Sequence, residues 1–257
     1  MTARIDALRA RIYRPLAAIA LAALFASCAA HRPPSTITPA PAPAVSEPSA
    51  APPVAPETPA AADTALERST ITATAQRTPL QLVYAWTLQE RDGRFSGKAA
   101  ARVEPPDRAR LDLFGPRGDG YLSAAVVGSE VRVPEGFRAQ AGVVPAPALL
   151  WTALGTLHPP EGARLTSAGR SGDRTQLDYA RGSEKWHFDV VSARLRHAEM
   201  ETGAHRYTVD LKGDGPLGLP KQAVYRDYAD FRELTLTLDQ AHEAQPFPPD
   251  TWIPGGR

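Results

Sequence analysis

The chain of 257 residues contains a single cysteine, Cys28. A disulfide within the chain is therefore excluded, and so is redox chemistry that needs a pair of thiols. Lysine is also scarce, with four among the 29 basic residues, and the formal charge of the whole chain is only +1. Such a balance gives no support for nucleic-acid binding, which needs a basic surface.

Catalytic and metal-binding motifs are missing as well. The sequence has no Gly-x-Ser-x-Gly elbow, and its acidic residues are scattered over faces that we expect to meet solvent. His187, His197 and His205 fall on separate predicted strands, without the spacing of a metal site. We therefore expect a protein that is not an enzyme and that holds neither a metal nor a cofactor. A hydrolase whose site is not visible in the sequence is the enzymatic alternative.

One glycine-rich run invites a different interpretation. Residues 213–218 fit the pattern Gly-x-Gly-x-x-Gly of dinucleotide-binding proteins. That site needs a helix to begin at the glycines, whereas Pro216 and Pro220 indicate a loop between two strands. The pattern therefore predicts a turn.

Long apolar segments are absent, and the run over residues 16–26 is too short to span a membrane. It follows four arginines, which is typical of a secretory signal. Ala26 and Ser27 then precede Cys28, and this arrangement resembles the lipobox of bacterial lipoproteins, in which the cysteine becomes the acylated first residue. An ordinary signal peptide cut between Ala26 and Ser27, or a free buried cysteine, is the alternative.

The lipobox resemblance implies a mature chain that begins at Cys28. Removal of residues 1–27, which carry four arginines and one aspartate, takes the formal charge from +1 to −2. Ala29 rather than aspartate follows the cysteine. By analogy with sorting rules for such proteins, this points to the outer membrane.

A proline-rich stretch follows the cysteine. Residues 29–62 hold ten of the 26 prolines and almost no large apolar side chain, so they cannot form a core. We expect an extended tether that reaches about 100 Å when drawn out at about 3.1 Å per residue. The predicted domains are a signal peptide over residues 1–27, an acylated cysteine with its tether over 28–63, and one globular domain over 64–257.

The globular domain begins with capping-box spacing between Thr64 and Glu67, which predicts a short helix. From residue 80 onward apolar side chains recur with a period of two, which is typical of β-strands. Residues 148–154 interrupt this pattern with a second helix that ends at Gly155. Strands are predicted at residues 80–88, 95–103, 109–113, 121–127, 130–133, 163–167, 175–180, 184–190, 194–201, 205–211, 224–228 and 233–238.

These elements describe a mainly β domain, a curved antiparallel sheet of about eleven strands with a helical lid or plug. Their order resembles LolB and its relatives of the LolA fold. The resemblance is carried by Gly-Arg-Phe-Ser-Gly at 93–97, by Arg-Ala-Arg-Leu-Asp-Leu-Phe-Gly-Pro-Arg-Gly at 108–118, by Leu150-Trp151 and Leu154-Gly155 on the helix, and by Leu-Thr-Leu-Thr-Leu at 234–238.

The resemblance implies an unclosed half-barrel that carries the acyl chains of lipoproteins through the periplasm or receives them at the outer membrane. The implied partners are membrane lipid through an acylated Cys28, and a lipoprotein acyl chain or a periplasmic carrier. We expect a monomer on the periplasmic face of the outer membrane. A non-catalytic envelope scaffold with the same fold, which binds a partner protein, is the alternative function.

A strongly twisted sheet must curl, and its concave face must be filled either by the lid or by a ligand. We expect the concave face to be lined by Tyr84, Trp86, Leu111, Leu113, Phe188 and Leu236, and the lid to present Leu150, Trp151 and Leu154.

One loop departs from the family. LolB carries an exposed leucine in a Pro-Leu-Gly loop between its third and fourth strands, and that leucine is thought to press into the membrane. The matching loop here reads Pro116-Arg117-Gly118. An arginine favours lipid head groups over acyl chains, so the prediction is a loop that faces the membrane surface without entering it.

Overall fold

The computed structural model describes residues 61–255, which belong to one compact unit. Cys28, the apolar run before it and most of the proline-rich stretch lie outside the described residues, so the signal, the anchor and the tether stay predictions. Within residues 61–255, no helix is both long enough and apolar enough to cross a membrane.

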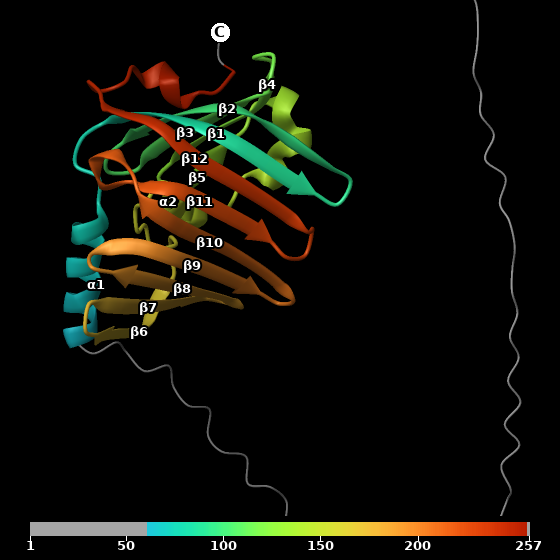
Figure 1. Ribbon diagram of the computed structural model, residues 1–257. Helices are drawn as coiled ribbons and strands as arrows, with labels where there is room; N and C mark the ends of the chain where they lie inside the picture. Colours follow the sequence, from blue (N-terminus) through green and yellow to red (C-terminus); the bar gives the residue numbers. More distant parts are fainter. Residues whose placement is uncertain (1–60, 256–257) are drawn as a thin grey trace, which may run out of the picture. The chain divides into compact units, whose positions relative to one another are not determined.

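A single antiparallel sheet of twelve strands makes up most of the domain (Figure 1). The spatial order is β5-β4-β3-β2-β1-β12-β11-β10-β9-β8-β7-β6. Because β5 and β6 end the sheet without bonding to each other, the barrel is unclosed, as predicted. The sheet has twelve strands where a total of about eleven was expected, and each of the twelve predicted ranges overlaps one of them. The strands are β1 Leu80–Glu90, β2 Gly93–Glu104, β3 Arg108–Phe114, β4 Gly120–Val127, β5 Glu130–Arg132, β6 Arg164–Ser171, β7 Arg174–Arg181, β8 Glu184–Val191, β9 Arg194–Thr202, β10 His205–Asp214, β11 Pro220–Asp227 and β12 Arg232–Glu243.

The alternation along β1 places one face of the strand in the core. Tyr84 and Trp86 are buried on that face and lie opposite Leu238 and Leu236 of β12. On its other side β1 pairs with β2, which contributes small residues such as Ala99 to the same face. Small side chains on β2 therefore leave room for the large aromatic side chains of β1.

Several strands run further than the apolar pattern indicates. β12 continues through polar residues to Glu243, which pairs with Leu80 at the start of β1. Backbone pairing with a neighbouring strand needs no apolar side chain, so the alternation underestimates the length of the strand.

Helix α1 spans Ala61–Thr74 and lies along one end of strands β6 to β9 (Figure 1). It begins one turn before the predicted Thr64, because alanines extend it toward the N-terminus. Its threonines are poor helix formers, but Thr70 and Thr74 each donate a hydroxyl hydrogen bond to a carbonyl one turn earlier. The same turn brings Thr74 Oγ1 within reach of the amide of Leu157, at 3.3 Å.

The predicted lid connects the two edge strands. The chain leaves β5, forms the 3₁₀ segment η1 Glu135–Val143 and helix α2 Pro147–Ala153, and then enters β6. Pro147 stands at the first turn of α2, where the lack of an N–H is harmless. Gly155 ends the helix with φ of +81°, and a Cβ there would meet Pro220 at 2.7 Å. The predicted helix and its glycine stop are confirmed.

The C-terminal segment covers the outer face of β3 and β4. Its 3₁₀ turn η3, Pro249–Trp252, buries Trp252 there. Arg110 Nη1 on β3 donates to the carbonyl oxygen of Thr251 at 2.9 Å. The inner face of the sheet is thereby left to the lid.

Candidate functional site

Helix α2 is buried on all sides beneath the sheet. All six residues from Ala148 to Ala153 are buried, and so is Leu154, which follows the helix. Thr152, its one polar side chain, donates to the carbonyl oxygen of Ala148 at 2.9 Å, so the helix has no face that needs solvent. It packs against β9, β10 and β11, so it closes the concave side of that half of the sheet.

The predicted cavity residues all belong to one core cluster together with the predicted lid residues. Each of them is at most 4% exposed, so none of their side chains faces an open space. The five surface pockets described in this domain are lined by other residues. The structure therefore brings these residues together, while their part in holding a ligand stays a prediction.

Two hydrogen bonds fix the side chain of Trp86 on the inner face of the sheet, which forms the floor beneath the lid. Its Nε1 donates to the carbonyl oxygens of Lys98 at 3.0 Å and of Phe114 at 2.9 Å. The indole reaches both because Gly97 has no side chain between them; a Cβ on Gly97 would lie 1.9 Å from the oxygen of Phe114. A bulge in the pairing of β3 with β4 at Leu113 and Phe114 accompanies this close approach.

Trp151 of the lid differs from Trp86 in its polar group. The side chain is buried, yet its Nε1 has no hydrogen-bond partner among the described residues. A buried indole N–H ordinarily finds an acceptor, because leaving it unpaired costs about 1–3 kcal/mol. The ring stacks on His158, with centroids 5.3 Å apart.

A cleft of about 460 Å³, the seam cleft, lies beside the N-terminus of the lid. Its volume falls within the range of small-molecule sites. Burial lowers the pKa of the His158 imidazole in its wall, and the carboxylate of Asp107 only partly opposes this. Its lining comprises Asp107, Gly128, Ser129, Ala146, Pro147, Ala148, His158, Pro159, Pro160, Glu161, Arg181 and Trp186.

Arg181 and Trp186 form the charged and apolar sides of the seam cleft. Arg181 donates to Glu184 Oε2 at 2.8 and 3.0 Å and to the carbonyl oxygen of Glu161 at 2.7 Å. Trp186 Nε1 donates to the same carboxylate of Glu184 at 3.3 Å. The cleft thus combines apolar walls with a few fixed polar groups, which is the usual composition of a ligand site.

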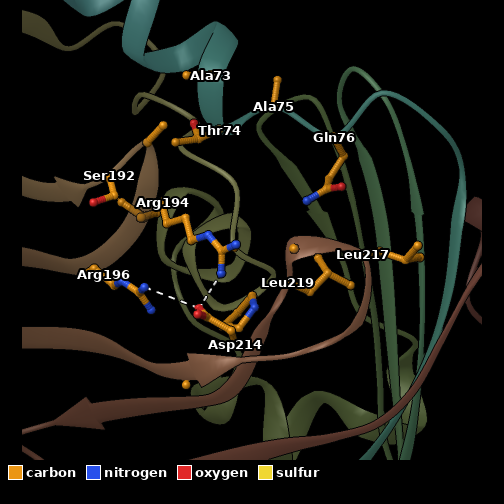
Figure 2. Close-up of a pocket in the computed structure, with 16 residues that line it drawn as sticks. Ala73, Thr74, Ala75, Gln76, Ser192, Arg194, Arg196, Asp214, Leu217 and Leu219 are labelled. Atoms are coloured by element: carbon orange, nitrogen blue, oxygen red, sulfur yellow. Dashed lines mark hydrogen bonds and ion pairs between the residues drawn. The ribbon is translucent and has the colours of Figure 1, made fainter. Parts of the chain in front are cut away.

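A smaller pocket of about 290 Å³ lies at the C-terminal end of α1 (Figure 2). Arg194 and Arg196 both reach Asp214 Oδ1, at 2.5 and 3.3 Å, and the hydrogen bond from Arg194 is the main reason that the pKa of Asp214 is lowered. Leu217 stands at its rim, about half exposed. Both arginines share this one carboxylate, so the charged residues that line the pocket leave a formal charge of +1.

The glycine-rich run borders the same pocket. Residues 213–218 form the end of β10 and the 3₁₀ turn η2, Pro216–Gly218, after which β11 follows directly. The predicted turn is confirmed, and no helix begins there to hold a pyrophosphate.

The loop between β3 and β4 contains the predicted membrane-facing residues Pro116, Arg117 and Gly118, and all three are exposed. Gly118 has φ of +84°, and the amide of Gly115 donates to the carbonyl oxygen of Asp119 at 2.7 Å. The loop is therefore a tight, projecting turn. Its contact with a membrane stays a prediction.

Two of the three predicted strand histidines, His187 and His197, lie on neighbouring strands and each has a carboxylate partner. His187 Nδ1 is 2.6 Å from Asp178, and His197 Nδ1 is 2.8 Å from Asp210. Among the described residues, no group of three or more His, Cys, Asp and Glu side chains is arranged to hold a metal ion.

Sequence reasoning missed His158 and the two prolines that follow it. Their position three to five residues after Gly155, which ends α2, was the available signal, because the chain that leaves a buried lid must return to the surface before it enters the next strand. The other walls of the seam cleft come from distant turns, whose approach depends on the curl of the sheet.

The architecture defines the class of protein as an unclosed, lid-covered half-barrel, and comparison with known proteins agrees. No protein-family model matches the chain, and no curated protein matches it significantly. Among solved structures, an outer membrane lipoprotein-sorting protein domain assigned in Vibrio parahaemolyticus is similar at 9% identity, with 74% of this chain and 96% of that chain covered and a TM-score of 0.53.

Two further solved structures are similar at lower scores. A LolA superfamily protein from Nitrosomonas europaea is 14% identical, with 72% of this chain and 96% of that chain covered and a TM-score of 0.49. A DUF1329 family protein from Desulfovibrio piger is 9% identical, with 77% and 98% covered and a TM-score of 0.42. The likeness to the Vibrio domain shows the fold: this chain has the LolA/LolB-like fold that its sequence motifs indicated.

Proposed function

We propose that this protein is a periplasmic lipoprotein, anchored to the outer membrane through an acylated Cys28, which binds acyl chains of lipids or lipoproteins between helix α2 and the sheet. The observation that carries the proposal is the lid itself. A short, buried and mostly apolar helix covers an apolar floor and belongs to the connection between the edge strands, so it can move without breaking any pairing of the sheet.

Two features support this location for the ligand. The seam cleft opens beside the first turn of the lid and offers a place where an acyl chain can begin to enter. The unpaired Nε1 of Trp151 would gain an acceptor from a carboxylate or ester oxygen at the head of such a chain.

Because the interior is filled, ligand binding must displace the lid, and the apparent affinity is lowered by the cost of opening. A variant that weakens lid packing should therefore bind more tightly. We expect Leu150→Ala, which weakens the packing of the lid and leaves Trp151 in place, to raise the affinity for a long-chain fatty acid, measured by displacement of an environment-sensitive apolar dye. Leu82→Ala is the matched control, since it removes an equally buried side chain from β1 and leaves the sequence of the lid unchanged.

Two outcomes contradict the proposal. One is a folded parent protein that binds no apolar probe while Leu150→Ala binds none either. The other is dye binding that a fatty acid does not displace, which would indicate a sticky surface in place of a pocket.

A second candidate function is an envelope scaffold that binds a partner protein. The filled interior favours it, since a domain whose core is complete needs no ligand. Absence of fatty-acid binding together with capture of a partner at an outer surface would support this candidate.

A further inference from the structure

Three neighbouring hairpin turns lie at the same end of the strands, opposite the end along which α1 lies (Figure 1). They are the turns β1–β2, β9–β10 and β11–β12, and they are adjacent because their strands pair with one another. Three exposed aromatic side chains lie at this end of the strands, and they are defined here as the aromatic rim: Phe95, Tyr228 and Phe231.

Phe231 is held outward by its turn. It is 65% exposed and has φ of +55°, a conformation that bulky side chains rarely adopt and that glycine or asparagine usually supplies. The turn is fixed from below by the buried carboxylate of Asp227, which accepts from the amides of Ala229 at 3.0 Å and Asp230 at 3.1 Å. A phenylalanine in this place does not help the turn to form, so its presence suggests another role.

Each of the two most projecting rings is paired with an arginine from the next hairpin. The guanidinium of Arg91 lies 4.9 Å from the ring centre of Phe231, and that of Arg206 lies 5.3 Å from the ring centre of Tyr228. Arg206 is also bonded to Glu199, whereas Arg91 makes no ion pair with any described residue. One cation at the rim is therefore available to an external anion.

We propose that the aromatic rim, with Arg91, is a surface that docks on an anionic phospholipid bilayer. An aromatic ring beside a guanidinium matches the boundary of a bilayer, where rings sit at the level of the head groups and cations meet phosphates. Separate hairpin tips suit this partner better than a protein, because a fluid surface needs no continuous complementary face. The inference rests on the proposed function only in that it assumes a membrane nearby.

Vesicle co-sedimentation tests the inference. The full chain with Cys28→Ser, which cannot be acylated, should bind phosphatidylglycerol-containing vesicles better than pure phosphatidylcholine vesicles. Phe231→Gly combined with Tyr228→Ser should weaken that binding about a hundredfold, since withdrawing each large ring from an apolar environment costs about tenfold. Arg91→Gln should reduce its dependence on salt.

Leu217→Ser is the matched control, because Leu217 is an exposed apolar residue with φ of +56° at the other end of β11. Parent-like vesicle binding by the rim double variant, or an equal loss in Leu217→Ser, overturns the inference, and so does a parent that binds neither kind of vesicle. Thermal unfolding should show that the double variant is folded.

Failure of this inference and failure of the proposed function are separable. A protein that binds fatty acid but does not bind vesicles contradicts the docking role of the aromatic rim and leaves the proposed carrier function intact. A protein that binds vesicles through the rim but binds no fatty acid contradicts the carrier function and leaves the docking role intact.

Discussion

At the scale of single residues, Gly97 decides whether the floor of the half-barrel can form. The hydrogen bonds of Trp86 to two strands depend on the space that Gly97 leaves. We expect Gly97→Ala to lower the free energy of unfolding by about 3 kcal/mol, because its methyl group would overlap a backbone carbonyl. Urea unfolding measures the change.

Gly169→Ala is the control for this substitution. Gly169 also lies in a strand, but a Cβ there meets nothing within 4 Å. Its replacement should be neutral or slightly stabilising, since glycine costs about 0.5–1 kcal/mol in a strand relative to alanine. Equal effects of the two substitutions would contradict the role given to Gly97.

His158 should make stability depend on pH. Its pKa is lowered in the folded protein by burial, so the unfolded chain binds the proton more readily. The contribution of His158 to the free energy of unfolding is therefore fully present above 6.5, the ordinary pKa of histidine, and is lost as the pH falls below that pKa. Urea midpoints should therefore fall between about pH 7.5 and pH 5.

His158→Phe keeps an aromatic ring against Trp151 and removes the titration. We expect this variant to lose less stability than the parent over the same pH range. A parent whose midpoint is flat in this range, or a variant with an unchanged slope, would show that His158 is not the group responsible.

At the scale of elements, the turn between β8 and β9 is formed by residues that do not suit it. Ser192 and Ala193 have φ of +50° and +59°. A two-residue turn with both values positive prefers glycine at the second position. Ala193→Gly should raise the free energy of unfolding by about 1 kcal/mol.

The neighbouring turn provides the comparison. In the β9–β10 turn Gly203 already has positive φ, and Ala204 does not. Ala204→Gly should therefore give no gain and should cost up to about 1 kcal/mol in backbone entropy. Thermal unfolding of Ala193→Gly and Ala204→Gly measures the difference. Higher stability in both variants would contradict the explanation by positive φ.

The strands and helix α2 were predictable because each has a local pattern. Alternation of apolar and polar side chains marks β1 at Leu80 to Leu88. Pro147 marks the start of α2, and Gly155 marks its end. The seam cleft was not predictable, since residues as distant as Asp107 and Trp186 meet only after the sheet has curled. Phe231 was missed for another reason: its left-handed backbone conformation is one that its residue type disfavours.

At the scale of the whole molecule, the domain has an apolar interior closed by the lid, and the sequence predicts a tether between the domain and its proposed anchor. The tether would keep the domain within about 100 Å of a membrane, so even a weak rim contact would be favoured by high local concentration. The anchor, the aromatic rim and the lid are thus separate parts of the chain, and substitutions in each can test its role independently.

The anchor rests on Cys28. Cys28→Ser should move the protein from the membrane fraction to the soluble fraction after detergent-free washing, because a single acylated residue carries the attachment. Ser27→Ala keeps a small residue before the cysteine and should stay membrane-bound. A Cys28→Ser protein that still sediments with membranes contradicts the lipoprotein interpretation.

The most direct test of the central claim is organic extraction of the purified protein followed by mass spectrometry. Extraction removes non-covalent ligands and leaves any acyl group on Cys28 attached to the chain. We predict an acyl lipid or fatty acid in near-stoichiometric amount, or its uptake when the protein is incubated with fatty acid. A protein that purifies without ligand and remains empty after that incubation would contradict the claim that the space beneath α2 binds acyl chains.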